Sequence, residues 1–253
     1  NQDATIKLLN TIPEKTALLE KFGVDTLIVH PFDAEFSKLT AAAFVKNILV
    51  DKLQIHKIII GHDHRFGVNR SANIDDLINF GKQYNFEVEQ ISAKEIDAIS
   101  VSSTKIRTAL LAGNVQVAND YLGHHYSFTG KVSEGKKNGR SIGHPTANIQ
   151  IEESYKLIPQ TGVYVVSSKI EEVLYYGMMN IGRNPTLGEN EQTIEVHFFD
   201  LNANLYGQNL TVSVLEHIRS EKKFDSLEAL KNQLDQDKKF SLDFIRQHET
   251  KLL

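Results

Sequence analysis

The sequence contains no cysteine and no long apolar run, and both absences narrow what the protein can do. Without cysteine, disulfides, thiolate catalysis and cysteine-based zinc sites are excluded. No apolar run approaches the roughly 18 residues needed to span a bilayer. No signal-peptide pattern opens the printed sequence. We therefore expect a cytoplasmic protein with no membrane partner.

The chain also carries little net charge, since 28 Lys and Arg stand against 32 Asp and Glu, which gives −4. This slightly acidic balance offers no general argument for a nucleic-acid partner. Any site for an anion must therefore be a local group of basic residues. At 253 residues, the chain is long enough for one large domain or two modest ones, each with its own core.

Apolar residues in the first half follow alternating helical and strand patterns. Helices are predicted over residues 11–22, 40–53, 73–84, 102–111 and 115–122, and buried strands over 26–30, 57–61 and 86–91. Such alternation is typical of a parallel α/β sheet. Three strands are few for a doubly wound domain.

The second half has a different pattern, in which strands separated by Gly, Pro or Asn turns follow one another. Strands are predicted over residues 126–133, 162–170, 173–181, 193–200 and 210–218, and a helix from residue 226 onward. Several spaced strands followed by a terminal helix predict a small β-barrel. We place the boundary near residue 124, which gives domains 1–124 and 125–253.

A segment rich in glycine and basic residues opens the second domain. Its members are Gly135, Lys136, Lys137, Gly139, Arg140 and Gly143. Glycine lets backbone amides approach an anion closely, although the same residues also mark ordinary solvated hairpin loops. No Lys-Ser/Thr pair follows, so this is not the common phosphate loop of nucleotide-binding proteins. Thr146 and Asn148 come next, and both carry hard oxygen donors of the kind that Mg²⁺ accepts.

One carboxylate stands out among the predicted strands. Glu195 and His197 share one face of their strand, and the apolar residues between them share the other. The alternative is a strand with one wet face, but Phe199 lies on the Glu195 side, which is unusual for a face in solvent. A phosphate loop, metal oxygens and a candidate base together indicate phosphoryl transfer.

The first half contains two further segments suited to anions. Ser102, Ser103 and Thr104 open a helix whose free amides could bind phosphate, although one hydroxyl there is enough for an ordinary N-cap. The polar segment 61–67 follows a buried strand at the sheet edge where α/β proteins bind ligands. A metal site there lacks a third ligand in the sequence, and a plain polar loop is the alternative. The charged segment 218–224, taken alone, is a solvated charge run.

Taken together, these segments resemble the bacterial bifunctional riboflavin kinase/FAD synthetase family over essentially the whole chain. The kinase resemblance rests on Gly139-Arg140-x-x-Gly143-x-Pro145-Thr146-Ala147-Asn148, Gly162-Val163-Tyr164, Asn180-Ile181-Gly182-x-x-Pro185-Thr186, Glu195-x-His197-x-Phe199-Asp200, Leu205-Tyr206-Gly207 and Ile218-Arg219-x-Glu221-x-Lys223-Phe224. The family usually has Phe where this chain has His144, a departure that could alter the pocket wall.

The resemblance implies a role for each matched position. Thr146 and Asn148 would hold Mg²⁺ and nucleotide phosphate, and Glu195 would be the catalytic base on the ribityl 5′-hydroxyl of riboflavin. Arg219 and Tyr164 would bind the flavin. ATP, the co-substrate, would have its phosphates bound by Gly135, Lys137, Gly139, Arg140, Gly143, Thr146 and Asn148.

The first half resembles the FMN adenylyltransferase module of the same family, a Rossmann-like α/β nucleotidyltransferase domain. The matching motifs are Gly61-x-Asp63-x-Arg65-Phe66-Gly67 and Ser102-Ser103-Thr104-x-Ile106-Arg107. They imply that the nucleotide is bound, during transfer of AMP to FMN, by Asp63, Arg65, Phe66, Ser102, Ser103, Thr104 and Arg107.

The family's opening strand and its His-x-Gly-His motif would lie upstream of Asn1, so the resemblance implies conversion of FMN to FAD only if the parent protein has that segment. The start at Asn rather than Met, together with the three-strand sheet, leads us to expect that segment in the parent protein. The alternative is a naturally short enzyme that works only as a kinase. A non-catalytic flavin-binding regulator is a third possibility, although Thr146, Asn148 and Glu195 argue against it because storage requires no base.

Overall fold

The computed structural model describes residues 6–61, 63–92, 95–96, 99–134, 143–183 and 192–252. The chain divides into two compact units, one formed by Asn1–Val24 with Ser102–Leu253 and the other by Asp25–Val101. Each unit has an apolar core of its own. Within the described residues, no helix combines the length and apolar character that crossing a membrane requires.

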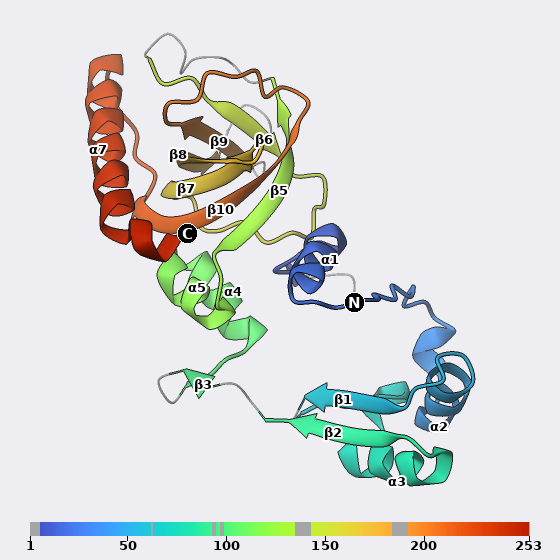
Figure 1. The fold of residues 1–253 in the computed structure, drawn as a ribbon. Coiled ribbons are helices and arrows are strands. Elements are labelled where there is room, and N and C mark those ends of the chain that lie inside the picture. The colour runs from blue at the N-terminus through green and yellow to red at the C-terminus, as the bar shows by residue number, and fades with distance from the viewer. Residues whose placement is uncertain are drawn as a thin grey trace. The chain divides into compact units, whose positions relative to one another are not determined.

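The unit Asp25–Val101 is built around one strand–helix–strand motif (Figure 1). Strands β1 (Lys57–Gly61) and β2 (Glu87–Ile91) pair in parallel, and α3 (Ile74–Tyr84) connects them. Asn73 caps the start of α3, and Asn85 ends it in the left-handed conformation. This arrangement confirms the predicted parallel α/β pattern, because two parallel strands need a crossover between them.

Shorter elements complete this unit. They are η1 (Phe36–Lys38), α2 (Ala41–Ala43), the π-helical η2 (Phe44–Val50), η3 (Val68–Arg70), β3 (Glu95–Ile96) and β4 (Ile99–Ser100). Val45 and Leu49 of η2 pack with Ile60, Leu77 and Phe86 in a small apolar core. The helix predicted over 40–53 is therefore present, but most of it has π-helical hydrogen bonding.

The strand predicted over residues 26–30 is wrong. The segment is irregular, and Ile28 and Val29 are each 59% exposed. An apolar run forms a strand only when a neighbouring strand pairs with its backbone, and no strand pairs with this one in the described part of the chain.

The other unit contains a closed six-stranded barrel, in the order β10-β5-β6-β9-β8-β7, with every pairing antiparallel. Its strands are β5 (Tyr126–Ser133), β6 (Ala147–Gln150), β7 (Gly162–Ile170), β8 (Val173–Arg183), β9 (Gln192–Phe198) and β10 (Asn209–Arg219). The predicted barrel is confirmed, and the one strand that the sequence patterns miss is β6. It has only four residues, and Ala and Asn are poor strand formers.

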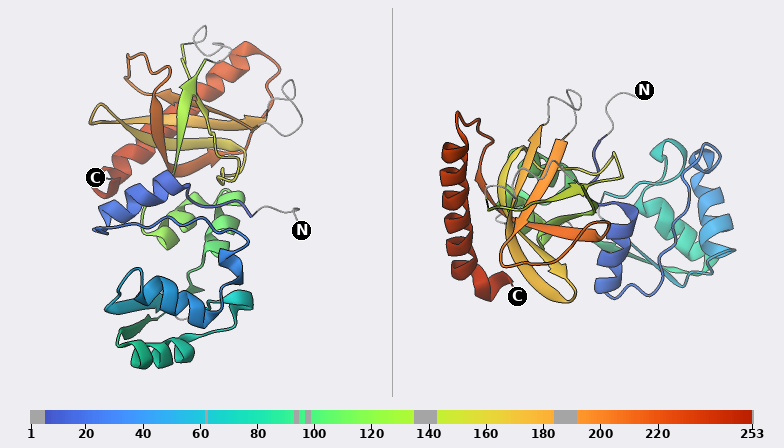
Figure 2. Two further views of the ribbon diagram at one scale, coloured as in Figure 1. Left: turned by 90° about the vertical axis from the view of Figure 1, so that its right-hand side faces the viewer. Right: turned by 90° about the horizontal axis from the view of Figure 1, so that it is seen from above.

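Helices of the same unit surround part of the barrel. Helices α4 (Ser103–Leu111) and α5 (Val115–Leu122) precede it in the chain, and Asn119 of α5 donates to the carbonyl of Val214. The long C-terminal helix α7 (Leu227–Leu252) runs along the outside of the barrel wall (Figure 2). Buried residues of β7, β8 and β10 pack against it, including Val165, Met178 and Leu215.

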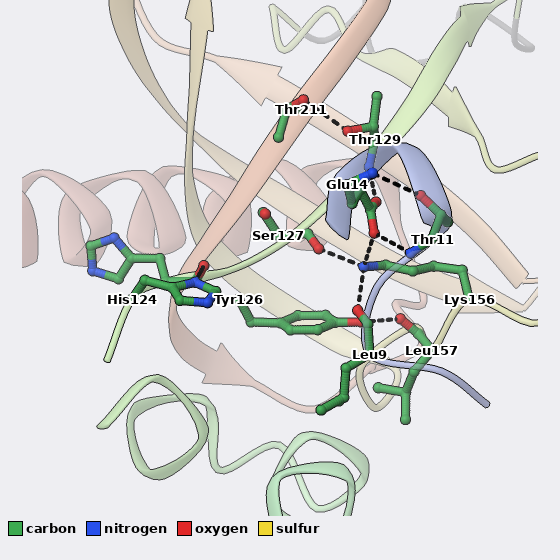
Figure 3. A network of polar contacts seen from close by, with 11 residues as sticks. Leu9, Thr11, Glu14, His124, Tyr126, Ser127, Thr129, Lys156, Leu157 and Thr211 are labelled. Atoms are coloured by element: carbon green, nitrogen blue, oxygen red, sulfur yellow. Dashed lines mark hydrogen bonds and ion pairs between the residues drawn. The ribbon is translucent and has the colours of Figure 1, made fainter. Parts of the chain in front are cut away.

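Helix α1 (Ile12–Lys21) is tied to the barrel through a buried ion pair (Figure 3). Lys156 Nζ donates to Glu14 Oε2 at 2.6 Å, to the carbonyl of Leu9 at 2.6 Å and to the carbonyl of Ser127 at 2.7 Å. Glu14 Oε1 accepts from the amide of Thr129 at 2.9 Å. Strand β6 pairs only with residues 131–133 of β5, so it does not reach the backbone groups of Ser127 and Thr129. The Lys156 ammonium and the Glu14 carboxylate bind those groups instead.

Candidate active site

A cavity of about 520 Å³ lies between the outer face of the barrel wall and α7. Its wall residues are His144, Thr146, Val163, Met178, Met179, Asn180, Glu195, His197, Arg219, Glu221, Lys222, Phe224, Leu227, Leu230 and Leu234. The polar members come mainly from β8, β9 and the segment before β6, whereas the leucines come from α7. A cavity with one apolar wall and convergent polar groups is the usual form of a small-molecule site.

Three adjacent strands place polar side chains around one carboxylate. In the barrel register, Glu195 of β9 lies opposite Asn148 of β6 on one side and opposite Asn180 of β8 on the other. Thr146 Oγ1 donates a hydrogen bond to Glu195 Oε2 at 3.1 Å. The segment containing Thr146 and Asn148 and the predicted base, 49 residues apart in sequence, are therefore brought together by strand pairing.

The Glu195 face of β9 is covered and is not a wet face. Phe199 is 5% exposed and belongs to the apolar cluster beneath α7, together with Ile245 of that helix. Lys238 of α7 has its Nζ 5.6 Å from the centroid of the Phe199 ring. The position of Phe199 thus has a simple explanation, because α7 covers that side of the strand.

Two histidines lie beside the carboxylate. His197 Nδ1 is 2.8 Å from the carbonyl oxygen of Pro145, and a proton on Nδ1 would donate to it. Burial lowers the pKa of His197, and the neighbouring His144 and Lys238 lower it further, while the bond to Pro145 opposes the shift. His144 is buried, and its Nε2 lies 3.3 Å from Oδ1 of Asp235 on α7. The lowered pKa favours the uncharged form of His197 near pH 7.

Arg219 lies at the end of β10, and α7 holds it in place. Its Nε donates to Asp237 Oδ1 at 3.0 Å and its Nη2 donates to Asp237 Oδ2 at 2.8 Å, a two-pronged contact. Asp237 is 2% exposed and also accepts from Gln233. The aromatic ring of Phe224 lies 5.7 Å from the guanidinium carbon. The Arg219 side chain thus has a fixed orientation at the cavity wall.

The chemistry of the donor set suits a hard divalent cation. The Thr146 hydroxyl and the Asn148 carboxamide offer neutral oxygens next to Glu195, and Mg²⁺ commonly takes few protein ligands plus substrate phosphates. Across the part of the chain that the structure describes, no group of three or more His, Cys, Asp or Glu could hold a metal by itself. A Mg²⁺ bound here would therefore rely on oxygens from Thr146, Asn148 and a phosphate-bearing substrate.

The glycine-rich segment predicted to bind ATP phosphates is described only in part. Gly135, Lys137, Gly139 and Arg140 lie outside the described residues. Gly143 has φ of +83°, a backbone conformation that favours glycine.

The remaining kinase position is Tyr164, which is fully buried. Its hydroxyl donates to the carbonyl of Gln160, and its ring lies 4.9 Å from that of His217. Its neighbour Val163 lines the cavity. The flavin-binding role of Tyr164 stays a prediction.

The adenylyltransferase positions belong to two different units. Asp63, Arg65 and Phe66 lie after β1 in the unit Asp25–Val101. Asp63 and Arg65 are exposed, whereas Phe66 packs partly against the small core of that unit.

The other group lies at the start of α4. Ser102 caps this helix by accepting from the amide of Lys105, as the N-cap alternative proposes. Ser103 and Thr104 form its first turn, and Arg107 Nε donates to the carbonyl of Lys7. Their nucleotide-binding roles stay predictions.

Sequence patterns do not single out Asn180, Met178 or Glu221 as site residues, although the structure places all three on the cavity wall. Asn180 and Glu221 occur within recognised motifs but have no distinguishing local pattern. Asn180 could be found by asking which residue of the neighbouring strand lies opposite Glu195. That requires the register between the two strands, which the sequence alone does not supply.

Comparisons with known proteins agree on both halves of the chain. A family model for riboflavin kinase matches residues 122–245, and one for FAD synthetase matches residues 1–105. A bifunctional riboflavin kinase/FMN adenylyltransferase of Buchnera aphidicola is 39% identical over 241 residues, covering 94% of this chain and 77% of the relative. A protein of the same description from Haemophilus influenzae is 38% identical over 230 residues, covering 90% of this chain and 74% of the relative.

A solved structure also resembles this fold. It is a crystal structure described as a macrolide-efflux protein from Streptococcus pneumoniae, with a TM-score of 0.84 and 33% identity. The match covers 92% of this chain and 75% of that one.

Proposed function

Because the chain belongs to the bifunctional riboflavin kinase/FMN adenylyltransferase family, we propose that it phosphorylates riboflavin with ATP to give FMN. The reaction takes place in the cavity between the barrel and α7. The observation that carries the proposal is the Glu195 carboxylate, held by Thr146 at 3.1 Å, in the wall of a cavity large enough for a flavin. We propose domains 1–124 for the adenylyltransferase and 125–253 for the kinase, a division that follows the two family matches and differs from the compact units of the structure.

In this proposal the residues of the cavity divide the work of phosphoryl transfer. Glu195 accepts the proton of the ribityl 5′-hydroxyl as its oxygen attacks the γ-phosphorus of ATP, and ADP leaves with the former β–γ bridging oxygen. Thr146 orients the Glu195 carboxylate, and Thr146 and Asn148 provide oxygens for Mg²⁺. Bound Mg²⁺ supplies neutralisation of phosphate charge. The leucines of α7 and Met178 exclude water and accommodate the apolar body of the flavin ring.

The second proposed reaction is transfer of AMP from ATP to FMN, with release of pyrophosphate, to give FAD. It rests on the FAD synthetase match over residues 1–105 and on the motifs around Asp63 and Ser102. We also propose a cytoplasmic location, in keeping with the absence of cysteine. Chromatography of a reaction containing riboflavin, ATP and Mg²⁺ measures FMN and FAD separately, so each activity is tested on its own.

The test of the kinase mechanism is Glu195→Gln, which keeps the shape of the side chain and removes its basicity. We expect turnover to fall by about 10²–10⁴-fold, the usual contribution of a placed base, with ATP binding retained. Glu172→Gln, on an exposed turn, is the matched control. Turnover within threefold of the unaltered protein would remove Glu195 from the mechanism. Absence of FMN with the unaltered protein would favour a flavin-binding regulator.

A further inference from the structure

His144 connects the segment before β6 to helix α7. Its side chain is 8% exposed, and its Nε2 lies 3.3 Å from Oδ1 of Asp235, a residue of α7. The residue usual in the family at this position is Phe, whose ring has no nitrogen to offer a carboxylate. The contact is therefore one that this chain makes because it has His144 there.

The surroundings of the imidazole leave Asp235 as the polar group that orients it. Nδ1, on the other side of the ring, is buried and has no hydrogen-bond partner among the residues that the structure describes. The ring of His197 packs edge-on, with the two ring centroids 5.0 Å apart. A carboxylate accepts hydrogen bonds and donates none, so the neutral His144 ring carries its proton on Nε2 when it bonds to Asp235.

The place of His144 matters because the two residues that follow it lead to the proposed base. The carbonyl oxygen of Pro145 lies 2.8 Å from Nδ1 of His197 on β9. Thr146 comes next, and its hydroxyl donates to Glu195 of the same strand at 3.1 Å. Helix α7 therefore holds one end of a short segment whose other end orients the Glu195 carboxylate.

The energetics of this contact favour an effect on the rate over an effect on folding. The Asp235 side chain is 59% exposed, and contacts of exposed charges contribute little to the free energy of unfolding. Catalysis is more sensitive, because misplacing a catalytic group by about 1 Å can lower turnover by about 10²-fold. A small displacement of the Thr146 hydroxyl is therefore costly to the reaction even where the barrel stays folded.

We propose that His144 is a positioning residue for the catalytic base. Through its contact with Asp235 it holds Thr146 where the threonine hydroxyl orients the carboxylate of Glu195. This inference rests on the proposed kinase function and deepens it, since it adds a link between α7 and the base. Without the link, the segment keeps its contact with β9 but loses its tie to α7, and the carboxylate faces the substrate hydroxyl less often.

The test is a set of variants assayed for FMN formation from riboflavin, ATP and Mg²⁺. His144→Phe keeps an aromatic ring and removes both nitrogens, and Asp235→Ala removes the partner. Asp243→Ala, which removes a half-buried carboxylate elsewhere on α7, is the control. We expect kcat to fall about three- to tenfold in either variant, the effect of about one hydrogen bond, and no further in the double variant. The KM for ATP should change less than about twofold.

The same change in a Glu195→Gln background separates positioning from a merely structural role. There His144→Phe should lower kcat less than about twofold, because no base is left to orient. Equal losses in both backgrounds, or an unaltered kcat in Asp235→Ala, would overturn the proposal. FMN formation that survives His144→Phe unchanged contradicts the positioning role alone, whereas no FMN with the unaltered protein contradicts the proposed function as well.

NMR of the imidazole nitrogens tests the contact without turnover. In the unaltered protein, the nitrogen chemical shifts of His144 should be those of a ring protonated on Nε2. The Nε2 shift should change in Asp235→Ala and stay the same in Asp243→Ala. An Nε2 shift that does not respond to Asp235→Ala would contradict the contact, and with it the positioning role.

Discussion

At the scale of single residues, the proposed function depends on side chains whose surroundings come from distant parts of the chain. The alternating pattern identifies Glu195 on its strand, yet the role we propose for it also requires Thr146 at 3.1 Å and the cover supplied by α7. Phe199 is the local sign that this face is not in solvent. Asn180 has no such sign, because a single Asn in a strand is common and only pairing with Glu195 makes it part of the site.

His197 should make the protein less stable in acid. Burial lowers its pKa below the ordinary value of 6.5, so the unfolded chain binds the proton more readily than the folded one. The free energy of unfolding should therefore fall as the pH drops below about 6.5, down to the lowered pKa. His197→Asn keeps a donor near Pro145 without titrating, so its stability should depend less on pH in that window.

The measurement is urea unfolding at several pH values between about 5 and 7.5, with the exposed His56→Asn as control. If the free energy of unfolding changes equally with pH in the His197→Asn variant and in the unaltered protein, another group causes the acid sensitivity. The variant should be less stable at every pH, but this does not affect the comparison, which concerns only the change with pH.

Asp237 should matter for stability because it is the buried partner of Arg219. Arg219→Ala would leave the Asp237 carboxylate, 2% exposed, without its two-pronged partner. We expect the free energy of unfolding to fall by about 3–5 kcal/mol, as for other broken buried pairs. Arg246→Ala removes an exposed side chain whose partner Asp243 is only half-buried, so it should lower the free energy of unfolding little by comparison. Thermal unfolding of both variants measures the two losses of stability. Equal losses would contradict the importance of the buried Arg219–Asp237 pair.

At the scale of elements, the buried pair of Glu14 and Lys156 joins α1 to β5. Lys156 has a side chain that is 0% exposed, and burial lowers its pKa while Glu14 opposes that shift. Each charge is therefore costly to leave alone. The first turn of α1 is thereby joined to the barrel, because Glu14 closes the capping box with Thr11 and also accepts from the amide of Thr129.

We expect Lys156→Met alone to destabilise the barrel by about 3–5 kcal/mol, because it leaves a buried carboxylate. The double variant Glu14→Leu with Lys156→Met should recover a large part of that loss, since neither charge remains. Urea unfolding of the two single variants and the double variant completes the cycle. Additive losses would show that the two side chains act independently.

At the scale of the whole molecule, the barrel unit includes residues from both ends of the sequence. Asn1–Val24 belongs with Ser102–Leu253, so the unit Asp25–Val101 is inserted between two segments of its neighbour. A cut near residue 124, where the sequence patterns change, would therefore remove α1 and its Glu14 from the barrel.

This arrangement can be tested by excision. A chain in which residues 25–101 are replaced by a long Gly/Ser linker should melt at a higher temperature than a chain that starts at residue 125. The linker version keeps Glu14 beside Lys156 and Thr129. FMN formation by both chains would show whether the kinase cavity survives. A higher melting temperature for the chain starting at 125 would contradict the role of α1.

Local sequence patterns determined the position of several barrel strands and the family of this protein. Periodicity placed the barrel strands 126–133 and 162–170 at the residues where the structure has them, because alternation and β-branched residues act over a few neighbours. The order of motifs also identified the family. Only the tertiary structure decided that α7 covers the Glu195 face, that β6 pairs beside it, and that His144 lies against Asp235 of α7. Those features depend on contacts between residues far apart in the chain, and register and burial arise only when the strands pair.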